Sequence, residues 1–154
     1  MIGYVCKYTP VEVFEAMGVE IRRIQPEVTN FNQADTLMHP NICSFTKSVL
    51  EDVLAGDYEG VVLTTCCDSI RRLYDVLKQQ CPDKFLYLLD VPRKVNDFST
   101  DMYRENILDM VHAYEAFSGK TFDEIVLKQL LERREAGQNL RTAPKNKASV
   151  HIGL

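Results

Sequence analysis

The chain has 154 residues, of which 45% are hydrophobic, enough for one ordinary domain with a sizeable core. A formal net charge of -4 and a pI near 5.4 argue against nucleic acid or an anionic membrane as the main partner. No apolar run approaches the roughly 20 residues that span a bilayer, and no secretory signal opens the sequence, so we expect a cytoplasmic protein without disulfides.

The first part of the chain predicts alternating strands and helices. In order, we expect a strand over residues 2–6, a helix over 11–17, a strand over 19–24, a loop over 26–41, a helix from Cys43 to Gly56, a strand over 61–65, a helix over 70–80 and a strand over 85–89. This alternation predicts an α/β fold, a Rossmann-like parallel sheet flanked by helices on both faces.

From Thr100 onwards the pattern becomes helical. One apolar stripe ends at Gly119, and Thr121-Phe122-Asp123-Glu124 fits a capping box for a second helix that Gly137 would close. We therefore expect residues 1–140 to form one domain with a C-terminal helical pair.

The end of the chain differs in character from what precedes it. Residues 141–148 are a polar linker, and residues 149–154 begin an apolar strand that the chain does not finish. A strand needs neighbours to bury both of its faces. We interpret residues 149–154 as the start of a truncated second domain; the alternative is a strand that joins the first sheet.

Two of the five cysteines, Cys43 and Cys67, lie where an apolar stretch meets an amphipathic helix. A helix start exposes unpaired N–H groups and the positive end of the helix dipole, so a thiol there ionises more easily and can bind a metal as thiolate. Cys67 also follows a buried strand, at a turn that faces the ligand crevice in open α/β sheets. The alternative for both is an ordinary buried cysteine.

The other three cysteines are weaker candidates. We expect Cys66 in the core, because neighbouring side chains in extended backbone point to opposite faces. Cys81 precedes Pro82 at a helix end and is interpreted as structural or exposed. Cys6 ends the first strand and could line the same crevice as Cys67. Since no C-x-x-C pattern occurs, any metal cluster must gather its ligands from distant segments.

The remaining polar residues give less specific signals. His39, His112 and His151 are typical of surface or packing positions. Arg71 and Arg72 could meet an anion at the crevice or form a solvated helix face. No G-x-G-x-x-G, Walker or G-x-S-x-G motif occurs, so dinucleotide binding, P-loop hydrolysis and serine hydrolysis lack support.

Four segments in order carry a resemblance to a known family. They are IGYVCKYTPVE at 2–12, CSFTKS at 43–48, TCCDSIRRLYD at 65–75 and LLDVPR at 88–93. They resemble the motifs G-Y-x-C-x-Y-x-P-x-E, C-S/P-x-x-R/K-S, C-D-x-x-R-R-L-Y-D and L-D-x-P-R of the 2-hydroxyacyl-CoA dehydratase D-component family, which also includes benzoyl-CoA reductase subunits. The resemblance runs through the whole chain.

The resemblance implies a subunit whose cysteines hold a [4Fe–4S] cluster, with Cys43 and Cys67 at two ligand positions. It implies the same role for Cys6 less strongly. The third ligand would come from a second domain, outside this chain. The resemblance also implies an ATP-dependent iron–sulfur activator protein that sends one electron to the cluster, which reduces an (R)-2-hydroxyacyl-CoA to a ketyl radical that loses its hydroxyl. Lys7 replaces a small hydroxyl residue of some catalytic subunits.

Three functions follow as expectations. The first is the N-terminal half of a dehydratase subunit that needs its C-terminal domain or a second subunit, and is inactive alone. The second is a benzoyl-CoA reductase-like, ATP-dependent reductase subunit. The third is a binding or assembly module without a cluster. Two thiols cannot hold a full cluster, so we expect this chain alone to bind a cluster weakly or not at all, unless Cys6 contributes or a homodimer shares one.

Overall fold

A computed structural model describes residues 1–27 and 29–142. Within this part of the chain, one all-parallel sheet has the strand order β2-β1-β3-β4. The strands are β1 (Ile2–Tyr4), β2 (Ile21–Arg23), β3 (Gly60–Thr64) and β4 (Phe85–Leu89). The helices are α1 (Val11–Ala16), α2 (Ala34–Leu37), α3 (Ser44–Ala55), α4 (Asp68–Gln80), α5 (Asp97–Ser118) and α6 (Glu124–Thr142). The predicted α/β fold is confirmed.

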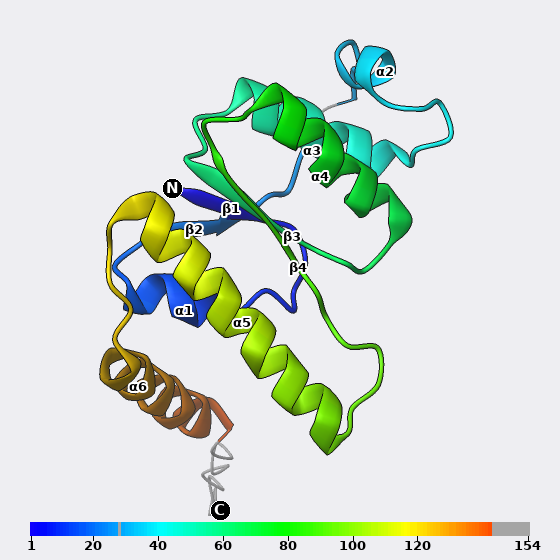
Figure 1. Ribbon diagram of the computed structural model, residues 1–154. Helices are drawn as coiled ribbons and strands as arrows, with labels where there is room; N and C mark the ends of the chain where they lie inside the picture. The colour runs from blue at the N-terminus through cyan, green and yellow to red at the C-terminus, as the bar shows by residue number, and fades with distance from the viewer. Residues whose placement is uncertain (28, 143–154) are drawn as a thin grey trace, which may run out of the picture.

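The sheet is covered on both faces, as Figure 1 shows. Val61 and Leu63 of β3 pack into a core with α3 and α4, whereas Val62 packs into a second core with α1 and α5. This division follows from the two-residue period of a strand, which sends successive side chains to opposite faces. All five residues of β3 are buried, as expected for a central strand of a parallel sheet.

The predicted boundaries hold at most helix ends. Cys43 and Cys67 are the N-cap residues of α3 and α4, and Gly119 ends α5 with a left-handed φ of 71°. Gly119 suits this position because glycine adopts positive φ without a Cβ clash.

Several boundaries differ from the predictions. The first strand ends at Tyr4 rather than at residue 6, β2 is shorter than the predicted range 19–24, β3 lies one residue before the predicted range 61–65, and α4 begins at Asp68 rather than at residue 70. The loop predicted over 26–41 contains the short helix α2. Helix α6 begins at Glu124, and the capping oxygen comes from Asp123, whose Oδ1 accepts the N–H of Ile125 at 2.8 Å. Gly137 was predicted to end α6, which is wrong, because the helix continues to Thr142 and Gly137 has no positive φ. Of the predicted linker over 141–148, the structure describes only residues 141 and 142; the rest and residues 149–154 lie outside the described residues.

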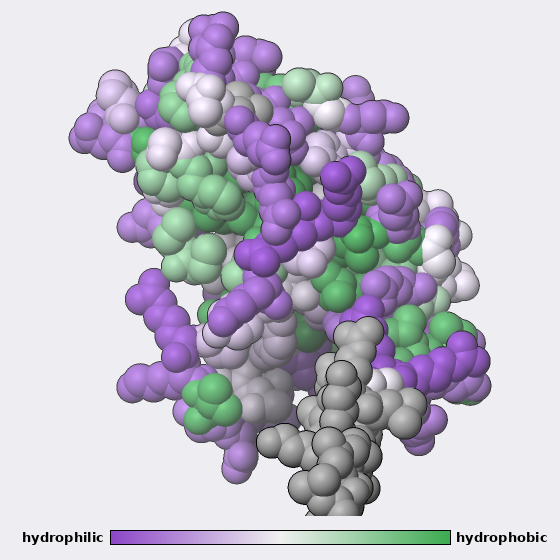
Figure 2. Space-filling view, turned by 180° about the vertical axis from the view of Figure 1, so that it is seen from behind, coloured by the Kyte–Doolittle hydropathy of each residue, from purple (hydrophilic) through white to green (hydrophobic). Residues whose placement is uncertain are grey.

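The helical pair predicted at the C-terminus is present, and α6 lies against α1. Arg134 of α6 forms ion pairs with Glu12 and with Glu15, the latter at 2.6 Å. Among the described residues, no helix is both long and apolar enough to cross a bilayer. Seen from behind, the surface is mostly hydrophilic with separate apolar groups (Figure 2).

Candidate functional site

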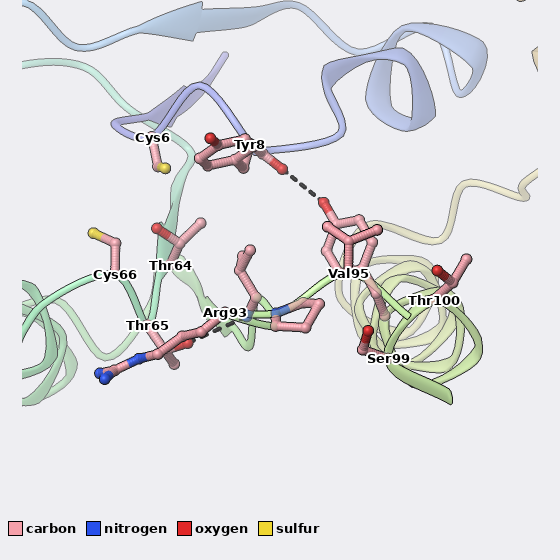
Figure 3. Close-up of a pocket in the computed structure, with 12 residues that line it drawn as sticks. Cys6, Tyr8, Thr64, Thr65, Cys66, Arg93, Val95, Ser99 and Thr100 are labelled. Atoms are coloured by element: carbon pink, nitrogen blue, oxygen red, sulfur yellow. Dashed lines mark hydrogen bonds between the residues drawn. The ribbon is translucent and has the colours of Figure 1, made fainter. Parts of the chain in front are cut away.

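The carboxyl ends of the strands meet at one edge of the sheet, where parallel α/β sheets bind ligands. Cys6 follows β1, Thr65 and Cys66 follow β3, and Val91 follows β4, all at this edge. Together with the start of α5 they enclose a cavity of about 620 Å³. Figure 3 shows its lining, which consists of Cys6, Tyr8, Thr64, Thr65, Cys66, Val91, Pro92, Arg93, Val95, Ser99, Thr100 and Tyr103.

Cys43 is exposed at the N-terminus of α3, and its Sγ lies 3.1 Å from Thr46 Oγ1. Partial burial by itself raises the pKa of the Cys43 thiol, but hydrogen bonds from Thr46 and Ser69 outweigh it, so the pKa is lowered. The contact with Ser69 also has a structural consequence. Since Ser69 lies in the first turn of α4, the thiol of Cys43 is close to the helix that Cys67 caps.

Cys67 is exposed at the N-terminus of α4. Its extended backbone, with φ of -154° and ψ of 164°, is typical of an N-cap residue. The N-termini of α3 and α4 therefore lie close to each other, and each helix begins directly after a cysteine whose side chain makes no capping hydrogen bond. This arrangement suits soft metal binding by thiolates.

Cys66 was predicted to lie in the core, and this is wrong. The side chain is exposed and lines the cavity. Strand β3 ends at Thr64, so the alternation of strand side chains no longer applies at Cys66. Partial burial raises the pKa of the Cys66 thiol, the hydroxyl of Thr64 partly offsets this rise, and the neighbouring thiols of Cys67 and Cys6 add to it.

Cys6 and Cys81 lie in different environments. Cys6 lines the cavity together with Cys66, as expected for the ends of neighbouring strands β1 and β3. Cys81 is buried in the core between α3, α4 and the sheet, which agrees with the structural interpretation of this residue.

His39 and Arg72 line a second hollow together with Ile42, Asp68 and Ser69, next to the starts of α3 and α4. His39 Nδ1 accepts the N–H of Asn41 at 3.2 Å in an exposed loop, and His112 is exposed on α5. His151 lies outside the described residues. Arg71 and Arg72 are both exposed, and Arg72 pairs with Asp75 at 3.5 Å. This places both arginines on a solvated face of α4.

The donor atoms fit an iron–sulfur cluster in part. Cys43 and Cys67 have the right chemistry, because clusters are bound by thiolates and one of these thiols has a lowered pKa. Across residues 1–27 and 29–142, however, no three His, Cys, Asp or Glu side chains group closely enough to hold a metal ion. The two thiols thus fit as part of a ligand set that other residues would complete.

A polar group inside the cavity was not foreseen from the sequence. Thr64 Oγ1 is buried and, within the described part of the chain, makes no regular hydrogen bond, the thiol of Cys66 being a weak partner. Buried hydroxyls are normally hydrogen-bonded, so a polar ligand atom in the cavity would satisfy this one. The burial of the Thr64 hydroxyl depends on segments that are distant in the sequence and close around the cavity. On the opposite wall, for example, Tyr103 Oη donates to the carbonyl of Tyr8 at 2.7 Å.

Comparison with known proteins identifies a family. The model of the 2-hydroxyglutaryl-CoA dehydratase D-component matches residues 6–146. The chain is 27% identical over 139 residues to the (R)-phenyllactyl-CoA dehydratase beta subunit of Clostridium sporogenes, covering 85% of this chain and 36% of that protein. It is 25% identical over 134 residues to a subunit of benzoyl-CoA reductase from Thauera aromatica, covering 83% and 35%. The chain spans about a third of the length of these curated relatives.

Proposed function

The chain belongs to the 2-hydroxyglutaryl-CoA dehydratase D-component family, and we propose that it is the N-terminal part of a 2-hydroxyacyl-CoA dehydratase subunit that carries a [4Fe–4S] cluster. The observation that supports this most directly is the pair of helix N-termini capped by Cys43 and Cys67. The lowered pKa of Cys43 favours the thiolate that a cluster iron requires.

The ligand set is completed elsewhere in this proposal. Cys43 and Cys67 hold the cluster from one side, and the remaining protein ligand comes from a C-terminal domain or a second subunit. Cys6 is the alternative donor within this chain. When bound, the cluster supplies low-potential one-electron transfer to an acyl-CoA thioester, with an ATP-dependent iron–sulfur activator as the electron source.

The cavity beside the thiols would take the acyl part of the thioester. Its volume of about 620 Å³ is within the range of small-molecule pockets, and Val91, Pro92 and Val95 give it apolar walls. Thr64 offers a buried hydroxyl to a polar atom of the ligand. Arg93 is exposed at the rim, where a guanidinium can pair with a phosphate of coenzyme A.

Two other functions are supported by particular observations. The identity to the benzoyl-CoA reductase subunit, nearly as high as that to the dehydratase subunit, supports an ATP-dependent reductase subunit in the same fold. A binding or assembly module without a cluster needs no cysteine ligands, and the cavity that the described residues form is compatible with such a role. For all three we propose a cytoplasmic location.

Anaerobic reconstitution tests the proposed function. The chain is incubated with iron, sulfide and an excess of a small thiol that can replace the missing ligand, and bound iron and absorbance at about 400 nm are measured. We expect wild type and the buried-cysteine control Cys81→Ala to take up iron, and Cys43→Ala and Cys67→Ala to lose most of it. Equal iron in all four proteins would refute the ligand assignment. Colourless, iron-free wild type would favour the module.

A further inference from the structure

Helix α2 is held by a carboxylate from another helix. Glu51 of α3 is only 8% exposed, and its Oε1 accepts the N–H of Gln33 at 2.7 Å and the N–H of Ala34 at 2.8 Å. A buried carboxylate is costly unless charge-assisted hydrogen bonds compensate for its lost water. Glu51 therefore replaces a local N-cap for α2, whose own N-cap residue makes no side-chain capping bond.

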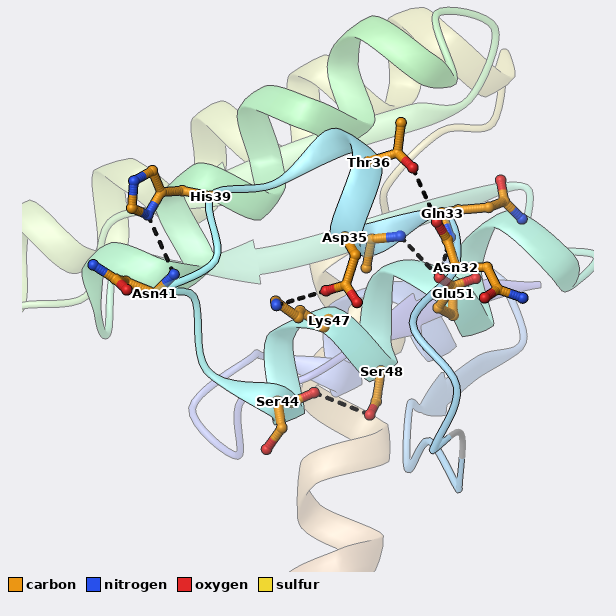
Figure 4. Close-up of polar contacts among 11 residues, drawn as sticks. Asn32, Gln33, Asp35, Thr36, His39, Asn41, Ser44, Lys47, Ser48 and Glu51 are labelled. Atoms are coloured by element: carbon orange, nitrogen blue, oxygen red, sulfur yellow. Dashed lines mark hydrogen bonds and ion pairs between the residues drawn. The ribbon is translucent and has the colours of Figure 1, made fainter.

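A second charged side chain holds the same segment. Lys47 Nζ lies 2.7 Å from Asp35 Oδ1, and the Lys47 side chain is 11% exposed. Its Nζ is also 6.0 Å from the centre of the Phe31 ring. Lys47 and Glu51 are four residues apart on α3, so they share one face of that helix, and both reach the α2 segment, as Figure 4 shows.

The segment held in this way leads directly to Cys43. After α2 the chain passes through Met38, which is buried, and Ile42, which packs on the same core. Cys43 then caps α3. Residues 31–42 thus form a segment that ends where α3 begins. The start of this segment is fastened by Lys47 and Glu51 to the first two turns of α3. A helix of four residues has no stability of its own, so the fastening depends on these contacts.

We infer that Glu51 and Lys47 are positioning residues for Cys43, because they fasten residues 31–42 to α3 and so fix where the Cys43 thiol lies relative to the start of α4. If Cys43 is a cluster ligand, as proposed above, this fastening sets the geometry of the two thiols before iron arrives. Neither side chain needs to touch the cluster or the substrate for this role.

The test compares two substitutions of Glu51. Glu51→Gln keeps an amide oxygen that can accept both N–H groups, whereas Glu51→Leu keeps a similar volume and accepts none. Glu132→Leu, at an exposed position on α6, is the matched control. Spin labels are placed on Cys43 and Cys67 of the full metal-free chain, with Cys6→Ser, Cys66→Ser and Cys81→Ala, and the distribution of label distances is measured together with deuterium uptake of residues 31–45.

We expect a broader distance distribution and at least about tenfold faster exchange in Glu51→Leu, with Glu51→Gln and Glu132→Leu close to wild type. A distribution in Glu51→Leu as narrow as in wild type would overturn the inference. Should Glu51→Leu not fold, Lys47→Met removes the second contact and is read in the same way. These measurements need no iron, so a failure of cluster binding would count against the proposed function and leave the positioning result to be judged separately.

Discussion

The hydroxyl of Thr65 donates a hydrogen bond to Asp90 Oδ1 at 2.5 Å and accepts one from the N–H of Val91 at 3.2 Å. The N–H of Thr65 also donates to the carbonyl of Leu89 at 3.0 Å. Asn106 of α5 donates to the carbonyl of Asp90 at 3.2 Å. The turn that carries Cys66 and Cys67 is therefore tied to the end of β4 and, through it, to α5.

A double-mutant cycle tests this tie. Asp90→Ala and Thr65→Val should each lower the free energy of unfolding by about 1 kcal/mol, measured with urea, because each removes a hydrogen bond to an ionised group that is partly solvated. The double variant should cost little more than Thr65→Val alone, because Thr65→Val already removes the bond to Asp90 together with the one from the N–H of Val91. Fully additive losses would mean that the two side chains do not interact in solution.

Thr46 should control the ionisation of Cys43. Thr46→Val keeps the size of the buried side chain but removes a hydroxyl within 3.1 Å of the thiol, so the pKa of Cys43 should rise. The measurement is the pH dependence of alkylation of Cys43 in the metal-free chain, followed by mass spectrometry. Thr121→Val, which alters an exposed threonine ahead of α6, is the control. Superimposed profiles for Thr46→Val and wild type would contradict the role of the hydroxyl.

The sequence predicted the parts of this edge that depend on local signals. The start of α3 at Cys43 follows from an apolar stripe at helical spacing, and a second stripe predicted α4 to within two residues of its observed start at Asp68. Residues of both stripes are what the two helices bury against the sheet. β4 was predicted with both of its ends, Phe85 and Leu89, because a buried apolar run between polar turns has few alternative interpretations.

Other features depend on contacts between distant segments. The sequence carries no local N-cap signal for helix α2. The N–H group of Ala34 at its start is instead bound by Glu51, 17 residues further along the chain. The wall of the cavity is closed by the bond from Tyr103 to Tyr8, which are 95 residues apart. Cys66 is exposed because β3 ends two residues earlier, at Thr64. Residue propensities do not locate the end of a strand to within one or two residues.

Two tyrosines should make the protein sensitive to alkali. Tyr58 Oη donates to Asp52 Oδ2 at 2.7 Å, and Tyr114 Oη lies 3.3 Å from Glu59 Oε1. Burial, together with these carboxylates, raises the pKa of each phenol to about 12 from the usual 10.0. The folded state thus holds these protons more tightly than the unfolded state. The stability they contribute is complete below pH 10.0 and is lost as the pH rises towards about 12.

Phenylalanine substitution checks this pH dependence. In Tyr58→Phe and Tyr114→Phe, the fall in unfolding free energy above about pH 10 should be smaller than in wild type, measured by urea unfolding at several pH values. Tyr8→Phe, at an exposed position, should follow the wild-type curve. An unchanged slope in both core variants would show that other groups govern alkaline unfolding.

Two glycines should respond to alanine in opposite directions. A Cβ on Gly60 would lie 2.6 Å from the Cβ of Phe85, its partner in β4, and would also collide with the Phe85 carbonyl. Because β3 and β4 are joined along their whole length, neither strand can move away alone, and Gly60→Ala should cost about 1–3 kcal/mol in urea unfolding. A Cβ on Gly137 meets nothing within 4 Å, and that residue lies inside α6, where alanine is the better helix former. Gly137→Ala should therefore add up to about 1 kcal/mol wherever α6 unfolds together with the sheet. A Gly60→Ala variant as stable as wild type would mean that β3 and β4 do not pair in this register, and the cysteines at the end of β3 would then lie elsewhere.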